Sequence, residues 1–197
     1  MDQLLPKFPD YVVKGRLLLE NPTDLVLKAF YFEDSRSETT NFYVTAFVLP
    51  LYVPTEFVHF TFGTDILAPQ RTLDTRAANL VEALTAAMQS QGIPFLSNLG
   101  TPPDMAAQAV ATTGAPEHPH VMEAVAYSLT VSQKWPEAAE SLARFLRRLD
   151  RVEQHNESIL AMKQRAELLQ RLITANPDQA LAQLQTWRGE TMVNLKL

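Results

Sequence analysis

Four arginines recur at helical spacing in the second half of the chain. They are Arg144, Arg147, Arg148 and Arg151, at positions i, i+3, i+4 and i+7, so a helix would carry all four on one face. Such a stripe can dock an acidic protein or a phosphate group, because guanidinium groups form charge-assisted hydrogen bonds with both. The alternative is a solvated helix face, since Glu140 precedes Arg144 by four residues and matches part of the charge. Both interpretations remain open from the sequence.

The histidines offer a second kind of chemistry. The segment Glu117-His118-Pro119-His120 places two imidazoles and a carboxylate close together, and both types of side chain can bind zinc. These residues lie too close in sequence to surround one metal ion, and no further ligand is obvious elsewhere in the chain. The segment is therefore interpreted as a loop that leads into a helix with Pro119 at its first position. His59 is interpreted as a half-buried sheet histidine or, alternatively, as a general base, because imidazole titrates near neutral pH. We therefore expect no metal and no cofactor.

Adjacent carboxylates at Glu33 and Asp34 could in principle perform acid–base catalysis. They are followed by Ser35, Arg36 and Ser37, and such a charged run is typical of a surface loop. The interpretation is a recognition loop over 33–41, with Glu33, Asp34 and Arg36 as partner-binding residues.

Composition narrows the function classes. The chain has 197 residues, no cysteine and a net charge of −5, so thiol catalysis and disulfides are excluded. Neither half of the chain is basic, which argues against nucleic-acid binding. No phosphate-binding glycine motif, zinc-protease motif or serine-nucleophile motif is present. No secretory leader or membrane span is expected from the pattern, and a cytoplasmic location is the default.

The elements that would position these residues change type near residue 70. Before it, β-branched and aromatic runs predict four strands of an antiparallel meander, over 11–19, 25–32, 42–49 and 57–62. After it, amphipathic helices dominate. Strands followed by helices predict an α+β fold: a four-stranded sheet, one long helix packed on it, and a region of about five helices.

The helices are marked by capping residues and proline. The first is expected to start after a cap at Thr72 or Asp74 and to end just before Gly92, with a buried stripe that runs from Ala77 to Met88. Others begin near Pro102, Pro119, Pro136, Glu153 and Pro177, since proline suits the first helical turn. The stretch 93–113 is the expected hinge, which divides the chain into 1–92 and 93–197.

The segment Met122–Asp150 resembles one tetratricopeptide-type helical hairpin. Small Ala126 and Ala138 stand where the two helices approach, and Trp135 stands at the turn where that family favours tyrosine. The family's proline after the second helix is Asp150 here. The resemblance implies contact with a protein; an ordinary helix pair packed on the sheet is the alternative.

The chain also resembles small bacterial proteins of the toxin-immunity kind, through 93–96, Thr101-Pro102 and the closing segment 187–191. This resemblance implies a non-enzymatic immunity-like, adaptor or accessory protein. We expect a protein partner, and the arginine stripe suits an acidic one.

Two alternatives follow from the middle strands, which are apolar on both faces. A pocket between sheet and helices, lined by Tyr31, Tyr43, Phe47 and His59, would make the protein a small-molecule binder or an enzyme. An uncovered sheet face would instead make it a homodimer.

Overall fold

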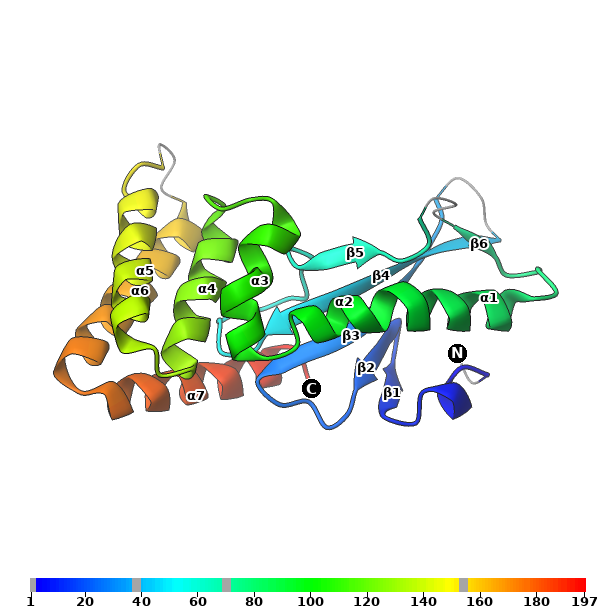
Figure 1. Cartoon of the computed structure of the whole chain (residues 1–197), viewed down its shortest axis with the longest axis horizontal. Helices are drawn as coiled ribbons and strands as arrows, with labels where there is room; N and C mark the ends of the chain where they lie inside the picture. Colours follow the sequence, from blue (N-terminus) through cyan, green and yellow to red (C-terminus); the bar gives the residue numbers. More distant parts are fainter. Residues whose placement is uncertain (1–2, 37–39, 69–71, 153–155) are drawn as a thin grey trace. The chain divides into compact units, whose positions relative to one another are not determined.

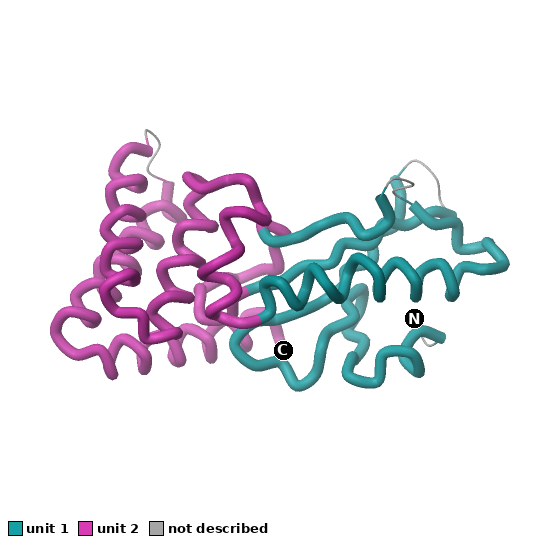
Figure 2. The backbone as a smooth tube through the Cα atoms, in the orientation of Figure 1, with its two compact units in different colours: residues 1–49, 62–100 teal, residues 50–61, 101–197 magenta. Residues whose placement is uncertain are grey.

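The structure, a computed structural model, describes residues 3–36, 40–68, 72–152 and 156–197. The chain forms two compact units (Figure 2). Unit 1 comprises Met1–Leu49 and Phe62–Gly100, and unit 2 comprises Pro50–Thr61 and Thr101–Leu197. The division after the strands thus falls at Gly100 instead of at 92. The segment 50–61 leaves the sheet and belongs to the helical unit.

Unit 1 is built on an antiparallel sheet, and the chain as a whole has an α+β fold (Figure 1). Its strands are β1 (Tyr11–Lys14), β2 (Leu17–Glu20), β3 (Val26–Asp34), β4 (Asn41–Pro50) and β5 (Gly63–Asp65), paired in that order, while β6 (Leu73–Asp74) pairs with β4. A short 3₁₀-helix, η1 (Leu5–Lys7), precedes them. The meander is confirmed, with more strands than the four expected.

Two of the expected strands differ from the sheet that forms. The single strand over 11–19 is a hairpin, because Gly15 adopts a positive φ of 59° and turns the chain so that Lys14 pairs with Leu17. The strand expected over 57–62 does not form, and His59 lies in irregular backbone. This segment is not in the ladder, because the side chains before it are anchored in the helices of unit 2.

One continuous helical stretch runs along unit 1. It consists of α1 (Leu80–Ala87), a π-helical turn η2 (Met88–Gly92) and α2 (Ile93–Asn98). Asp74 does not cap α1; its carboxylate accepts from the backbone N–H of Arg76 instead. Gly92 does not end the helix either. A Cβ at Gly92 would lie 2.9 Å from Cζ of the buried Phe30 and closer still to Cε1, so glycine allows η2 to pack directly on β3.

Unit 2 contains five helices among the residues described. They are α3 (Pro102–Thr113), α4 (Pro119–Val131), α5 (Trp135–Leu149), α6 (Glu157–Ala175) and α7 (Pro177–Asn194). Each packs against the next, and α4 also contacts α6 and α7. The helix starts expected at proline are confirmed, whereas the start expected at Glu153 lies outside the described residues. None of the described helices is long and apolar enough to cross a membrane.

Side-chain caps and a left-handed glycine define several of these helix ends. Thr101, Asn156 and Asn176 accept hydrogen bonds from backbone N–H groups of the first turns of α3, α6 and α7. Gly114 ends α3 with a φ of 63°.

The segment 50–61 is held in unit 2 by three hydrogen bonds. The hydroxyls of the buried Tyr52 and Ser128 lie 2.6 Å apart. Further along, Thr191 donates to the carbonyl of Val53 and Asn194 donates to a carbonyl of the same segment. These contacts fix the backbone that carries Phe57 and His59.

Candidate functional site

Two arginines of the predicted stripe are structural. Arg144 and Arg148 lie on α5 and donate to the carbonyls of Pro116 and Glu117, each over 3.2 Å. The Glu117 carboxylate lies 3.7 Å from both guanidinium groups. These two side chains therefore hold the loop between α3 and α4.

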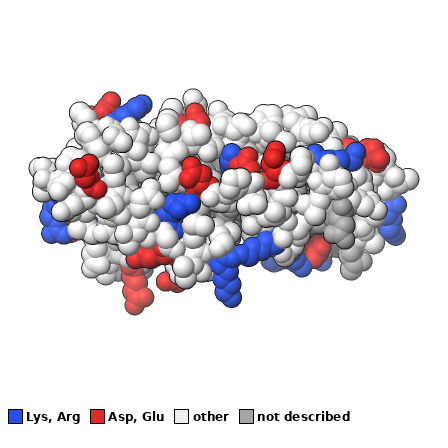
Figure 3. Space-filling model, turned by 90° about the horizontal axis from the view of Figure 1, so that it is seen from below, with Lys and Arg blue, Asp and Glu red and all other residues white. Residues whose placement is uncertain are grey.

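The other two members of the stripe remain available. Arg147 and Arg151 are exposed, and neither forms an ion pair with a residue that the structure describes. On the face drawn in Figure 3, acidic and basic side chains are intermingled, and no large field of one sign is seen there. The free positive charge of the stripe is thus limited to two side chains.

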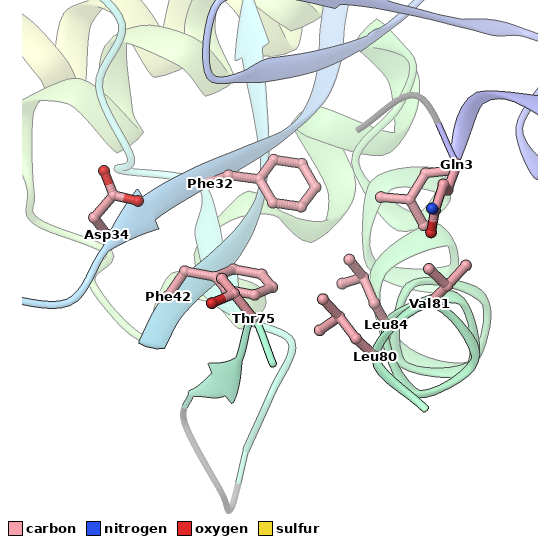
Figure 4. A pocket seen from close by; sticks show the side chains of 9 residues that line it. Gln3, Phe32, Asp34, Phe42, Thr75, Leu80, Val81 and Leu84 are labelled. Atoms are coloured by element: carbon pink, nitrogen blue, oxygen red, sulfur yellow. The ribbon is translucent and has the colours of Figure 1, made fainter. Parts of the chain in front are cut away.

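A cavity of about 590 Å³ in unit 1 lies between α1 and the strands β3 and β4. Phe32 and Phe42 project from the strands toward α1, with ring centroids 6.2 Å apart (Figure 4). We call this cavity the α1 groove; its apolar wall comprises Leu4, Phe32, Phe42, Leu80, Val81 and Leu84. Polar groups at Gln3, Asp34 and Thr75 complete the lining.

A second hollow of about 300 Å³ adjoins the α1 groove. It is lined by Glu33, Asp34, Arg36 and Tyr43, so Asp34 contributes to both cavities. The Asp34 carboxylate also accepts from Arg16 on the turn between β1 and β2, over 2.6 Å. The structure therefore brings the three charged residues of the expected recognition loop together, although residues 37–39 of that loop are outside the described residues.

The aromatic pocket expected around His59 is divided between the two units. Tyr31, Tyr43 and Phe47 lie on β3 and β4 of unit 1, whereas His59 belongs to unit 2. Phe47 is fully buried. Among these four residues, Tyr43 alone lines one of the hollows described above.

In unit 2 three histidines form a cluster. The rings of His59 and His120 stack with centroids 5.4 Å apart, and His118 lies 5.6 Å from His120. Burial lowers the pKa of His59, and the neighbouring His118 lowers it further. Burial, the other two imidazoles and Arg165 lower the pKa of His120 to about 4. His59 and His120 are therefore neutral at pH 7, and no group of metal-ligating side chains with suitable geometry is found in the described ranges.

Beside this cluster lies a buried ion pair. Arg165 of α6 donates from Nε and Nη2 to the same carboxylate oxygen of Glu123 on α4, over 3.2 and 2.8 Å. The Glu123 side chain is 1% exposed and that of Arg165 is 21% exposed. Burial raises the pKa of Glu123, and Arg165 opposes that rise. The second carboxylate oxygen of Glu123 and the hydroxyl of Tyr127 find no hydrogen-bond partner among the described residues.

The sequence interpretation missed this pair, which joins residues far apart in the chain. Its one local signal was a carboxylate at Glu123 within the apolar run of α4, between Met122 and Ala124. A charged residue at such a position is buried only when a partner neutralises it. That signal requires a cation on a neighbouring helix, and it does not say which one.

A third cavity, of about 350 Å³, lies in unit 2 beside the ion pair. We call it the acidic pocket. It is lined by residues 54–57, by His120, and by one face of α6 that includes Glu157, Ser158, Met162 and Arg165. Ser158 and His120 both line this cavity, and no hydrogen bond joins their side chains among the described residues.

Comparison with protein-family models, with curated proteins and with solved structures finds no match for this chain.

Proposed function

We propose that this protein is a non-enzymatic protein-binding protein whose α1 groove holds an apolar segment of a partner. The observation that carries the proposal is the pairing of this apolar cavity with a charged hollow that shares Asp34. An apolar centre beside a polar rim is the usual anatomy of a protein interface.

The groove offers suitable side chains for this role. Phe32 and Phe42 supply two aromatic rings, and Leu80 and Val81 of α1 are only half-buried. Aromatic residues in a partly enclosed cavity often contribute most of the affinity of an interface. The charged hollow at Glu33 then favours correct partners over wrong ones, because charges at a rim affect specificity more than affinity.

The helical unit offers a further proposed contact. Arg147 and Arg151 are the exposed cations of α5, and we propose that they bind acidic groups of a partner. The helices α4 and α5 carry the tetratricopeptide-like segment, which supports a role in protein contact. An adaptor or immunity-like role is consistent with both surfaces.

The proposal is tested by filling the groove. Val81→Arg places a charged side chain in the groove, whereas Ala86→Arg places the same side chain on an exposed position of the same helix. Both tagged variants and the wild type are used to capture partners from the native host, with circular dichroism as a check on folding. We expect one stoichiometric protein with the wild type and Ala86→Arg, and its loss with Val81→Arg.

Equal capture by all three proteins would refute the α1 groove as the binding site. Light scattering on the purified protein then tests the homodimer alternative, and thermal shifts with a metabolite panel test the small-molecule alternative. A dimer or a ligand that is lost in Val81→Arg would replace the proposed function.

A further inference from the structure

The acidic pocket in unit 2 is independent of the α1 groove, and its chemistry points to a different ligand. We infer that it binds an arginine side chain presented by a partner protein, with the guanidinium group between Glu56 and Glu157 and stacked on Phe57. The three features that carry this inference are the uncompensated charge, the exposed aromatic ring and the form of the cavity.

The first feature is the charge of the lining at neutral pH. Arg165 is neutralised by the buried Glu123, which takes both of its donated hydrogen bonds. His120 carries no charge at pH 7, since its pKa is about 4. Glu56 and Glu157 are exposed, and neither forms an ion pair with a residue in the described ranges. The pocket therefore presents two free carboxylates and favours a cation.

The second feature is Phe57. Its side chain is 68% exposed, the largest exposure of any described aromatic residue in the chain. Thr55 fixes this position, because its hydroxyl donates to the carbonyl of Phe57 and its own carbonyl accepts from Asn194. An exposed aromatic ring on a fixed backbone beside carboxylates is the arrangement in which a guanidinium group stacks on the ring face.

The third feature is the form of the cavity. Its volume of about 350 Å³ is at the lower end of the range for ligand pockets and suits a single side chain. Ala161 and Met162 of α6 give it an apolar wall, against which the aliphatic part of an arginine can pack. Arginine is favoured over lysine because its planar group stacks on aromatic rings and binds carboxylates through two parallel hydrogen bonds.

The nearest alternative is an anion bound to Arg165. That guanidinium group already serves the Glu123 carboxylate, and a second anion there would face Glu56 and Glu157 at the cavity lining. The net charge of the lining therefore opposes a carboxylate or phosphate ligand. A metal ion is not supported either, since no set of ligating side chains with suitable geometry occurs among the described residues.

The test uses small probes on the whole protein. Nα-acetyl-arginine amide is titrated into ¹⁵N-labelled protein and followed by NMR, with Nα-acetyl-citrulline amide as an uncharged probe of nearly the same shape. Nα-acetyl-lysine amide and inorganic phosphate are titrated in parallel. We expect saturable shifts at residues 54–57 and 157–162 with the arginine probe, weaker shifts with lysine, and none with citrulline or phosphate.

Variants then assign the contacts. The double variant Glu56→Gln/Glu157→Gln is expected to weaken arginine binding by about tenfold, because two charge-assisted contacts are lost. Phe57→Leu should weaken it less, and Glu140→Gln, which removes an exposed carboxylate elsewhere in the same unit, should leave it unchanged. Both glutamates of the double variant are exposed, so folding is not at risk.

Equal binding of arginine and citrulline, saturable binding of phosphate at these residues, or an unchanged affinity in the double variant would each overturn the inference. Val81→Arg should have no effect, which separates this site from the α1 groove.

Discussion

The contact between Gly92 and Phe30 gives the sharpest stability prediction. Gly92 lies in η2 with a helical φ of −68°, so alanine would relieve the poor helix propensity of glycine by about 1 kcal/mol. An alanine Cβ would however lie 2.9 Å from Cζ of Phe30 and closer to Cε1. Phe30 is fully buried, so its ring has little room to move, and overpacking of this kind costs about 3 kcal/mol. We expect Gly92→Ala to destabilise unit 1 by about 2 kcal/mol.

A double-mutant cycle with Phe30→Leu tests this explanation, because that substitution removes the ring atoms that the new methyl group would contact. In that background Gly92→Ala should be stabilising by about 1 kcal/mol, because only the gain in helix propensity remains. The two substitutions are therefore expected to couple by about 3 kcal/mol.

The assay must report on unit 1. Both tryptophans, Trp135 and Trp187, lie in unit 2, so their fluorescence does not follow this site. Hydrogen exchange of the backbone amides of α1 and α2 gives the local free energy of opening, and urea unfolding followed by circular dichroism gives the global value. The reasoning would be refuted if Gly92→Ala stabilised the wild type, or if it cost the same in both backgrounds.

Three further predictions concern unit 2 and are followed by tryptophan fluorescence during urea unfolding. Glu123→Gln should destabilise the unit by about 3 kcal/mol, since it leaves Arg165 without a counter-ion, whereas Glu123→Leu combined with Arg165→Met should recover most of that loss. A cost below about 1 kcal/mol for Glu123→Gln would show that the pair is not buried in solution. His120 has a pKa of about 4 in the folded protein, against an ordinary value of 6.5. As the pH falls, this histidine is therefore protonated in the unfolded state before it is protonated in the folded state. The free energy of unfolding is unaffected by this group above pH 6.5 and decreases between pH 6.5 and pH 4. Allowing for its partial exposure, we expect wild type to lose about 1 kcal/mol more than His120→Gln between pH 7 and pH 4, and parallel pH profiles would contradict this. Thr101→Ala should cost about 1 kcal/mol through the lost cap of α3, while Thr186→Ala, exposed within α7, should change stability far less; equal effects would argue against the cap.

The parts of the fold that the sequence predicted are those decided locally. Pro102, Pro119, Pro136 and Pro177 each mark a helix start, because proline lacks the N–H group that the first helical turn leaves unpaired. The strand expected over 57–62 failed for the opposite reason. Its alternating pattern is that of a strand, but hydrogen bonds such as that between Tyr52 and Ser128 hold the residues just before it against helices that are distant in sequence.

Gly92 shows a second limit of local reasoning. A glycine followed by Pro94 is typical of a helix end, yet the helical stretch continues through η2. The wider π-helical turn precedes the proline, whose ring an uninterrupted α-helix would not accept without strain. The glycine is required by Phe30, on a strand far earlier in the chain, and no local pattern contains that information.

The candidate sites were predictable in part. Glu33, Asp34 and Arg36 were identified from their charge and do line one hollow. The apolar α1 groove was not identified, because its wall combines Leu4 near the start of the chain with strands and with α1. Such a cavity forms where apolar side chains of different elements leave a space between them. A periodic pattern in the sequence indicates only which face of one element is apolar.

The excursion of residues 50–61 bears on how the chain is synthesised. Val48 donates to the carbonyl of Phe62 over 3.0 Å, so backbone pairing with β4 resumes directly after the excursion. The partners of the excursion, Ser128, Thr191 and Asn194, are translated much later. At ordinary ribosomal speeds the interval is on the order of ten seconds. During this interval Leu51 and Tyr52, both fully buried in the folded protein, lack their partners from the helical unit. The hydrogen bonding that holds residues 50–61 in the helical unit is therefore complete only after Thr191 and Asn194 have been translated.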